Sequence, residues 1–317
     1  MAKDTITVIM AVYNVAATIT ETIRSVLNQT YRNLTLLIID DCSTDGSDFI
    51  LKNFAKEDPR ITYVRMQTNQ GVAYVRNYGL DHAKTEWVAF FDGDDIWRED
   101  KLEKQVSLRD RMLRGDVPMY LDNGDPNPMY PAIIFSGTAY MDYKGNRYGY
   151  ILHAPDSVTY KKLLKQNVIS FSSALVNKSV MEKFPVDGNL HEDFFCWLTV
   201  LKKGFVAYGI DEPLMTYRID RDSASGNKWA AAKKNYNVYK KLRFGRIKSF
   251  YYMICYARRN SAKYNKSRRA DPLSSMNQST APPVRRASFP RARFYFALFF
   301  YPCFTPYALR TAQEIGR

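Results

Sequence analysis

The sequence predicts an α/β protein that begins with a parallel sheet wound in the Rossmann manner, continues into a mixed α+β region and ends in a basic tail. Strand-like and helix-like segments alternate along the first hundred residues, which is typical of parallel sheets with helical crossovers. The strand-like runs are apolar throughout, as expected for strands covered by helices on both faces. They lie at 5–13, 34–40, 61–66 and 86–91.

Helices are predicted between these strands, as the crossovers of a parallel sheet require. Apolar residues recur at helical spacing in 16–29, at Ile19, Ile23, Val26 and Leu27. The turn cluster 41–47 precedes a second helix, which could be capped by Ser43, Thr44 or Asp45. We expect a third helix to open at Gly71 and to run to about Ala83.

Shorter and more varied elements are predicted after about residue 115. They are a loop at 116–131, a hairpin at 133–150, short helices at 158–166 and 177–184, a longer helix at 191–203 closed by Gly204, and strands at 205–210 and 213–219. We expect this half to cover the carboxyl edge of the sheet. The predicted domain boundaries are therefore 1–115, 116–228 and 229–317.

The net charge of +14 is concentrated in the last quarter of the chain. Residues 240–317 contain 17 Lys and Arg and two acidic residues, whereas residues 1–239 contain 29 Lys and Arg and 30 acidic residues. The sequence pI near 9.5 therefore describes the tail. A nucleic-acid-binding domain would carry its basic residues on the folded body, so the neutral body argues against that class. Within the tail, 229–264 has a helical tendency, 265–293 is rich in Ser, Pro and Arg, and 294–309 is aromatic with two prolines.

The cysteines and the N-terminus indicate the cytosol. The four cysteines are far apart and form no CxxC pair, at Cys42, Cys196, Cys255 and Cys303. This spacing argues against a zinc site or a disulfide framework and favours a reducing compartment. The first residues lack the pattern of a signal peptide, and no unbroken apolar run reaches the roughly 18 residues of a membrane-spanning helix.

An acidic cluster, FFDGDD (90–95), follows the fourth predicted strand. Its carboxylates are Asp92, Asp94 and Asp95. Three carboxylates in four residues repel one another unless a cation neutralises them, and Mg²⁺ or Mn²⁺ with oxygen ligands does this well. An ion held by one or two carboxylates keeps positions open for a diphosphate, whose departure it would assist. A solvated acidic loop is the alternative, but ligands of open α/β sheets bind beyond the carboxyl ends of the strands.

Three further motifs follow strands of the same predicted sheet. In AVYN (11–14), Tyr13 could stack on a nucleobase or lie on the surface. In IIDDCSTDGS (38–47), Asp41 could accept a hydrogen bond from a base, although a helix-capping turn explains part of this motif. In NQGVAYVRNYGL (69–80), Arg76 could pair with a pyrophosphate or be an exposed helical arginine.

The segment HEDFFCW (191–197) begins a predicted helix with two acids. Glu192 and Asp193 in the first turn suit the helix dipole. They could equally supply a general base that deprotonates an acceptor hydroxyl as it attacks the anomeric carbon of a sugar.

Taken in order, these motifs resemble the family 2 glycosyltransferases of the GT-A fold. The resemblance rests on VIMAVYN, VLNQTYRNLTLLIIDDCSTDGS, NQGVAYVRNYGL, FFDGDD and an ED pair roughly one hundred residues later. It covers about residues 5–220. Each motif alone is weak, but the ordered set is specific. The resemblance implies a nucleotide-diphosphate sugar donor, commonly a UDP-sugar, with Mg²⁺ or Mn²⁺ and inversion by a single displacement.

The resemblance also implies roles for single residues. Asp193 would be the catalytic base with support from Glu192, and Asp94 would be the chief metal ligand beside Asp92 and Asp95. The donor would contact Ala11, Tyr13, Asn14, Asp41, Arg76, Asp92, Gly93 and Asp94. The segment YRIDRDSAS (217–225) resembles a phosphate-proximal segment of the family, but Asp220 stands where a histidine is frequent, which leaves the role of this loop open.

The tail suggests a membrane contact. Basic residues attract anionic lipid and aromatic residues favour the interface, and many relatives build lipid-linked glycans. We therefore expect a cytoplasmic enzyme that is peripheral on the inner face of the cell membrane and serves surface-polysaccharide synthesis; a solvated tail is the alternative. Two other functions remain: a nucleotidyltransferase that makes NDP-sugars, which would carry a Gly-rich loop where YNVAATIT stands, and a catalytically inactive glycan-binding relative.

Overall fold

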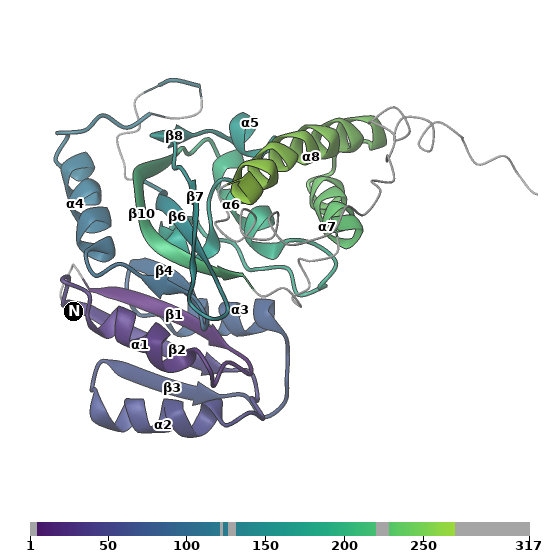
Figure 1. Cartoon of the computed structure of the whole chain (residues 1–317). Coiled ribbons are helices and arrows are strands. Elements are labelled where there is room, and N and C mark those ends of the chain that lie inside the picture. Colours follow the sequence, from purple (N-terminus) through teal and green to yellow (C-terminus); the bar gives the residue numbers. More distant parts are fainter. Residues whose placement is uncertain (1–4, 121–122, 126–130, 220–227, 270–317) are drawn as a thin grey trace, which may run out of the picture. The chain divides into compact units, whose positions relative to one another are not determined.

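The computed structural model, which describes residues 5–120, 123–125, 131–219 and 228–269, contains one ten-stranded sheet (Figure 1). The strand order along its main path is β3-β2-β1-β4-β9-β6-β10-β5, while β7 pairs with β6 and β8 with β10. All these residues belong to the first of the two units of the chain, Met1–Ser274.

The first four strands are parallel and match the prediction closely. They are β1 (Ile6–Val12), β2 (Leu34–Asp40), β3 (Ile61–Arg65) and β4 (Trp87–Asp92). The helices between them are α1 (Ile19–Leu27), α2 (Ser47–Glu57) and α3 (Val72–His82). Of the three candidate caps, Asp45 accepts from the backbone N–H of Ser47 at 3.0 Å, the first residue of α2.

Helices cover both faces of this sheet, which explains the unbroken apolar runs. The residues of α1 and α2 pack with Val8, Met10 and Leu36 on one face, whereas α3 packs with Ile9 and others on the opposite face. The α3 helix approaches β1 closely, because a Cβ on Gly79 would lie 2.3 Å from Cγ2 of Ile9. Glycine at this position therefore lets α3 sit directly on the sheet.

The second half extends the same sheet. Strand β9 pairs antiparallel with β4, β6 pairs antiparallel with β9, and β10 runs parallel to β6. The bounds are β5 (Ile96–Trp97), β6 (Ile133–Asp142), β7 (Arg147–Leu152), β8 (Ser157–Val158), β9 (Leu175–Asn177) and β10 (Ala207–Ile219). The β6–β7 hairpin was predicted; the two predicted last strands are one long strand, β10, with bulges between Ile210 and Met215.

The helices of this half are α4 (Lys101–Leu113), α5 (Tyr160–Leu163), α6 (Glu192–Lys202), α7 (Lys228–Lys241) and α8 (Arg246–Arg269), with 3₁₀ turns η1 (Phe171–Ser173) and η2 (Lys178–Val180). The α6 helix confirms the prediction, and Gly204 follows it with φ +99°. The helix predicted at 177–184 is wrong. Asn177 ends β9, and its side chain accepts from the N–H of Ser179, which produces a single 3₁₀ turn.

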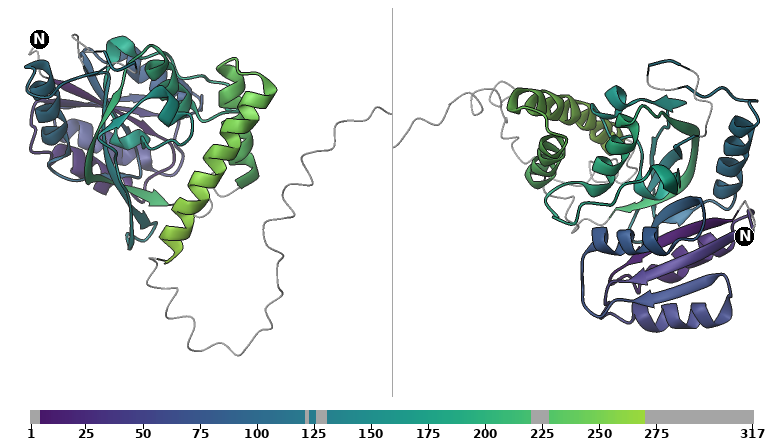
Figure 2. Two further views of the ribbon diagram at one scale, coloured as in Figure 1. Left: turned by 90° about the horizontal axis from the view of Figure 1, so that it is seen from above. Right: turned by 180° about the vertical axis from the view of Figure 1, so that it is seen from behind.

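The described part of the tail consists of α7 and α8, which pack on the core (Figure 2). Tyr239 of α7 is fully buried and contacts Phe194 of α6, whose ring also lies 5.6 Å from that of Tyr256 of α8. Among the described residues, no helix is both long and apolar enough to cross a membrane. The predicted segment 294–309, the loop residue Asp220 and most of 265–293 lie outside the described residues.

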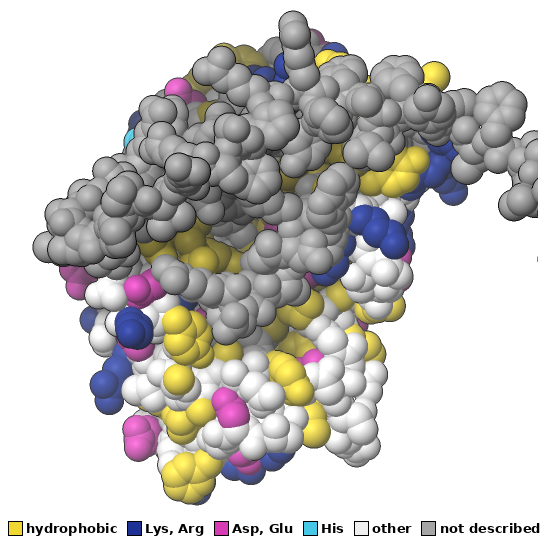
Figure 3. All heavy atoms as spheres, turned by 45° about the vertical axis from the view of Figure 1, so that its right-hand side comes forward, with side chains coloured by type: hydrophobic (Ala, Val, Ile, Leu, Met, Phe, Trp, Pro, Cys, Tyr) yellow, Lys and Arg dark blue, Asp and Glu magenta, His cyan; other side chains and the backbone are white. Residues whose placement is uncertain are grey.

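On the face drawn in Figure 3, Lys and Arg side chains are scattered among acidic and hydrophobic ones over the described surface. This fits the neutral charge balance of residues 1–239.

Candidate active site at the carboxyl edge of the sheet

Strand register brings the predicted motifs to one edge. In the parallel ladder, Ala11 pairs with Asp92 and Val12 pairs with Asp40. The segments that follow β1, β2 and β4 therefore leave the sheet side by side, at the edge where open α/β sheets bind ligands.

The segment after β1 is fastened to the turn after β2. Asn14 adopts a left-handed backbone with φ +51°, which asparagine tolerates better than most residues. Its side-chain oxygen accepts from the N–H of Thr44 at 2.9 Å, and its own N–H donates to Oγ of Ser43 at 3.0 Å. Beside it, Tyr13 is 49% exposed, so its ring is available to a ligand.

Asp41 supports the loop that leads into α3. It is buried, and its two carboxylate oxygens accept from the N–H groups of Gln70 at 2.7 Å and Gly71 at 2.8 Å. These bonds hold the start of α3 against the end of β2. They give Asp41 a structural role, and its contact with a base stays a prediction.

Gly93 lets the acidic turn pack against the segment after β1. A Cβ on Gly93 would lie 3.1 Å from Val15 and 3.4 Å from Val12. Its carbonyl accepts from Oγ1 of Thr18 at 3.3 Å. A side chain at this position would push the acidic turn away from the β1 segment.

The three carboxylates of this turn have different surroundings. Asp95 is fully buried and accepts from Oγ of Ser172 at 2.6 Å and from the N–H of Arg218 at 3.1 Å. Burial, and then the charges of Asp94 and Asp92, raise the pKa of the Asp95 carboxyl well above its ordinary value. Asp92 and Asp94 are half-buried. The turn is therefore a site of accumulated negative charge.

Arg76 joins the acidic turn to the first turn of α6. Its guanidinium donates to Asp92 at 2.8 Å and to Glu192 at 2.7 Å, and it lies 3.5 Å from the ring centroid of Phe171. Its side chain is 7% exposed. Burial disfavours its charge, but Asp92 and Glu192 outweigh burial and raise the pKa of Arg76. The structure thus gives Arg76 two carboxylate partners; its pairing with a pyrophosphate stays a prediction.

Asp193 lies beside this bridge. It is half-buried, and Nδ2 of Asn167 lies 3.4 Å from its Oδ2. Burial and the neighbouring charge of Glu192 raise the pKa of the Asp193 carboxyl, against the opposing charges of His191 and Arg76. A carboxylate with a raised pKa is a stronger base than an ordinary aspartate, which suits proton abstraction.

Several residues of the site were not found by sequence reasoning. Asn167, Phe171 and Ser172 come from a short irregular segment without periodicity. Arg218 belongs to YRIDRDSAS, the one signal that pointed to it. Its guanidinium donates to the carbonyl of Asp94 at 2.9 Å and to Glu21 at 2.8 Å.

The residues fit a divalent cation that is shared with a ligand. No group of three or more His, Cys, Asp or Glu in the described ranges could hold a metal ion by itself. An open site needs fewer protein ligands, because a hard cation completes its shell with phosphate oxygens and water. The half-buried Asp92 and Asp94 provide carboxylate oxygens as ligands for the cation. Their negative charges add to burial in raising the pKa of Asp95, so a cation beside them would relieve the repulsion among the three carboxylates.

Comparison with known proteins identifies the family. Residues 7–160 match the family described as Glycosyl transferase family 2. The chain is 35% identical over 258 residues to TuaG of Bacillus subtilis (strain 168), named for teichuronic acid biosynthesis, and covers 96% of it; the match takes up 81% of this chain. The chain belongs to glycosyltransferase family 2.

A further family relative is WfgD of Escherichia coli. It is 30% identical over 252 residues, which are 79% of this chain and 91% of WfgD. Its name describes a UDP-Glc:α-D-GlcNAc-diphosphoundecaprenol β-1,3-glucosyltransferase. This family membership makes the chain a glycosyltransferase and disfavours the nucleotidyltransferase alternative.

Solved structures confirm the GT-A fold. S. aureus TarS (residues 1–349) in complex with UDP-GlcNAc has a TM-score of 0.58 at 15% identity; the match covers 75% of this chain but only 65% of TarS, just under two thirds of its length. A mannosyltransferase from Pyrobaculum calidifontis, in complex with GDP-Man and Mn²⁺, has a TM-score of 0.57 at 18% identity over 88% of this chain and 76% of its own.

Proposed function

We propose that this glycosyltransferase moves a sugar from a UDP-sugar to a hydroxyl of a lipid-linked glycan, with inversion, in the synthesis of a cell-surface polysaccharide. One observation carries the proposal. Arg76 holds Asp92 of the acidic turn and Glu192, next to Asp193, within a single bridge. A donor site and a candidate base therefore lie at the same edge of the sheet.

The residues divide the reaction between them. The exposed ring of Tyr13 would stack on the base, and Asp94 with Asp92 would hold Mg²⁺ or Mn²⁺. The cation would stabilise the negative charge on the departing diphosphate. The Asp193 carboxylate would take the proton of the acceptor hydroxyl as its oxygen attacks the anomeric carbon. The bond to the diphosphate oxygen breaks in the same step, so the nucleoside diphosphate leaves and the configuration inverts.

The names of the relatives support the donor and the pathway. WfgD is named as an enzyme that uses UDP-Glc and a diphosphoundecaprenol acceptor, TuaG is named for teichuronic acid biosynthesis, and TarS was solved with UDP-GlcNAc. The Mn²⁺ in the P. calidifontis structure supports a metal-dependent site. Within the shared donor class, the individual sugar would be set by the pocket walls.

We place the enzyme in the cytoplasm, peripheral on the inner face of the cell membrane, with the basic tail as the contact. The charge excess of residues 240–317 supports this placement. Deletion of residues 270–317 should reduce co-sedimentation with anionic vesicles and leave nucleotide binding intact. Unchanged co-sedimentation would exclude a contact through residues 270–317, which carry six of the 17 Lys and Arg of residues 240–317.

Nucleotide-dependent stabilisation tests the donor site. UDP, GDP, CMP and ADP are compared, each with and without Mn²⁺, on the wild type, on Asp94→Ala and on Asp116→Ala, an exposed acid outside the site. A ligand at 100 times its Kd should add about 2.7 kcal/mol to the free energy of unfolding. We expect UDP with Mn²⁺ to stabilise the wild type and Asp116→Ala but not Asp94→Ala. If no nucleotide stabilises the folded protein, the donor-site assignment is wrong.

Turnover then tests the reaction itself. A panel of UDP-sugars with a diphosphoprenol-linked sugar as acceptor should yield UDP and an extended glycan, and NMR of the new anomeric proton should show inversion. An enzyme that binds UDP but turns over no sugar with any acceptor would favour the inactive-relative alternative.

A further inference from the structure

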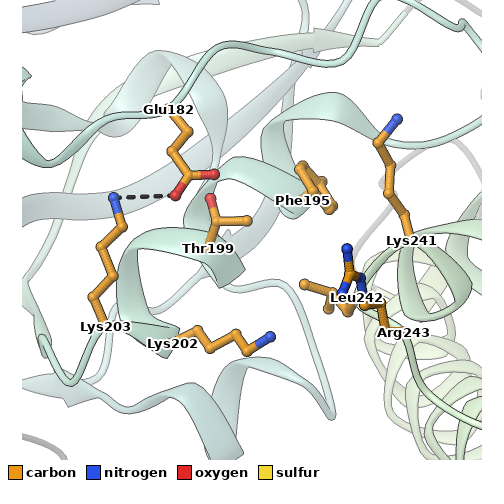
Figure 4. A pocket seen from close by; sticks show the side chains of 8 residues that line it. All are labelled: Glu182, Phe195, Thr199, Lys202, Lys203, Lys241, Leu242 and Arg243. Carbon is orange, nitrogen blue, oxygen red and sulfur yellow. Dashed lines mark ion pairs between the residues drawn. The ribbon is translucent and has the colours of Figure 1, made fainter.

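A cavity lies along the face of α6 that points away from Asp193. It has a volume of about 390 Å³ and is lined by α6, by the end of α7 and by the two residues that follow α7 (Figure 4). The α6 helix lines it with one face, since Phe195, Thr199, Lys202 and Lys203 are spaced i, i+4, i+7 and i+8. At about 100° per residue, these four positions lie on the side of α6 opposite Asp193. This cavity is therefore separate from the candidate active site.

Four cations and one carboxylate line this cavity. Lys203 pairs with Glu182 at 3.1 Å, and Lys241 pairs with Asp187 at 2.9 Å. Lys202 and Arg243 have exposed side chains, and neither has an ion-pair partner among the described residues. The described residues thus compensate only part of the positive charge in the cavity.

Helix ends explain some of these cations but not all. Lysines in the last turn of a helix interact favourably with its dipole, which accounts for Lys202 and Lys241. Arg243 is different because it follows α7 in a left-handed conformation, with φ +65°. The N–H of Phe244 donates to the carbonyl of Tyr239 at 3.1 Å, which closes a Schellman motif. Glycine is the usual residue at the left-handed position, so arginine there is strained.

The lining indicates the kind of ligand. Arginine and lysine together are the usual donors to phosphate oxygens. Ligand pockets generally span roughly 300–1,000 Å³, so the cavity has room for more than a bare ion. The ring of Phe195, 5.8 Å from Nζ of Lys241, provides an apolar wall beside the charges. A phosphate joined to a small organic group matches both features.

We propose that this cavity binds a phosphate mono- or diester, with Lys202 and Arg243 as its principal donors. A need for the Arg243 side chain in the cavity would account for its strained backbone. The phosphate could come from a lipid headgroup or from a soluble phosphorylated compound, and both present the same chemistry to the site.

Calorimetric titration of the full chain with glycerol 3-phosphate, at constant ionic strength, tests this proposal. Glycerol and inorganic phosphate are titrated in parallel. The pocket variant is Lys202→Gln/Arg243→Gly, and the control is Lys56→Gln/Lys84→Gln, which removes two exposed charges elsewhere. Wild type and control should bind glycerol 3-phosphate saturably, and the pocket variant should bind at least tenfold more weakly. Its unfolding midpoint should not fall, because glycine relieves the strain at 243.

Absence of saturable binding to the wild type, or equal weakening in the pocket variant and the control, would overturn the proposal. UDP-dependent stabilisation should be unchanged in the pocket variant, so this test and that of the donor site fail independently. Vesicles of phosphatidylglycerol and of phosphatidylcholine then identify the source, with both proteins compared after deletion of residues 270–317, because the tail is itself proposed to bind anionic vesicles. Loss of phosphatidylglycerol binding in the pocket variant indicates a headgroup; vesicle binding equal to that of the wild type, with glycerol 3-phosphate binding lost, indicates a soluble phosphate.

Discussion

Two buried cations of this protein, Arg76 and Lys101, lie in opposite electrostatic surroundings. Arg76 contacts two carboxylates and the ring of Phe171 at the carboxyl edge of the sheet. Lys101 is fully buried at the start of α4, where its Nζ donates to Oε1 of Gln105 at 2.7 Å and lies 3.9 Å from the ring centroid of Trp97. Both cations are buried against aromatic rings, but within the described residues only Arg76 has carboxylate partners.

This difference decides what each cation does. The acids around Arg76 raise its pKa, whereas burial lowers the pKa of Lys101 well below its ordinary value. Gln105, the partner of Lys101, donates in turn to the carbonyls of Ile134 and Ser173. Arg76 therefore organises charge in the candidate site, while Lys101 belongs to a packing network, and substitutions of the two should behave differently.

The largest effect is expected at Asp193, which lies beside the Arg76 bridge. Asp193→Asn should lower kcat by about 10²–10⁴-fold, the usual contribution of a general base. Because burial and Glu192 raise the pKa of Asp193, kcat/KM of the wild type should fall as the pH drops through that raised pKa. Steady-state assays across pH measure both.

Stability provides the control for this variant. A carboxyl whose pKa is raised on folding stabilises the fold only when protonated, and this contribution is lost as the pH rises from the ordinary pKa of 3.8 to the raised one. Asp193→Asn should therefore be no less stable than the wild type at neutral pH. Full turnover by this variant would rule out the base role.

The next largest effect is on stability. Arg76→Met leaves Asp92 and Glu192 without their cation and should cost about 3 kcal/mol of unfolding free energy, as for other broken buried ion pairs. Urea denaturation measures the loss. Arg76→Lys keeps the positive charge but lacks the forked guanidinium that reaches both carboxylates. Its free energy of unfolding should therefore lie between those of the wild type and Arg76→Met. A loss from Arg76→Met no larger than that from Arg76→Lys would show that the bridge does not depend on charge.

Lys101→Met should have a much smaller effect, and one that depends on pH. Since its pKa is lowered on folding, Lys101 destabilises the protonated fold, so wild-type stability should rise with pH between the lowered pKa and 10.5. The methionine variant lacks this dependence. At neutral pH, removal of the buried lysine charge should offset the roughly 1–3 kcal/mol cost of leaving the Gln105 oxygen without a hydrogen-bond donor. Denaturation of the wild type and Lys101→Met across neutral and alkaline pH measures how the difference in their unfolding free energies changes. The corresponding difference between the wild type and Arg76→Met should not vary in that range.

The smallest effect is expected at Arg243, an exposed cation for which the described residues provide no acidic partner. Relief of a left-handed arginine is worth about 1–2 kcal/mol, and glycine costs roughly 0.5–1 kcal/mol in chain entropy. Arg243→Gly alone should thus raise the unfolding free energy by about 0.5 kcal/mol, measurable by urea denaturation. Arg243→Ala keeps the left-handed strain and should not stabilise. Equal stability of the two variants would remove the strain argument.

Sequence reasoning succeeded where the signal is local. The strands β1 to β4 are unbroken apolar runs, and α6 has a clear start and a glycine stop, so both were predicted within a residue or two. The α4 helix was missed because KLEKQVSLRDRML is rich in charges, and burial of Lys101 has no pattern in such a run. The three residues of β9 were too few to indicate a strand.

The site was predictable in its residue types but not in its pairings. The acids at 92–95 and 192–193 stand out in the sequence, as does Arg76. The ion pair between Arg76 and Glu192 joins residues 116 positions apart. No local pattern in the sequence of α3 predicts that this helix contacts α6. Ser172 and Asn167 were missed for the same reason. An isolated polar residue gives no sequence signal, and its role is evident only once the fold places it beside an acid.

The antiparallel pairing of β4 with β9 has a consequence for biosynthesis. β4 is complete at residue 92, but its partner is not made until residues 175–177. At 5–20 residues per second, translation leaves that strand edge open for roughly 4–17 s. An open edge can pair with another nascent chain. The order of synthesis therefore sets a window for misassembly, and a fragment that stops before residue 175 would keep the edge of β4 permanently exposed.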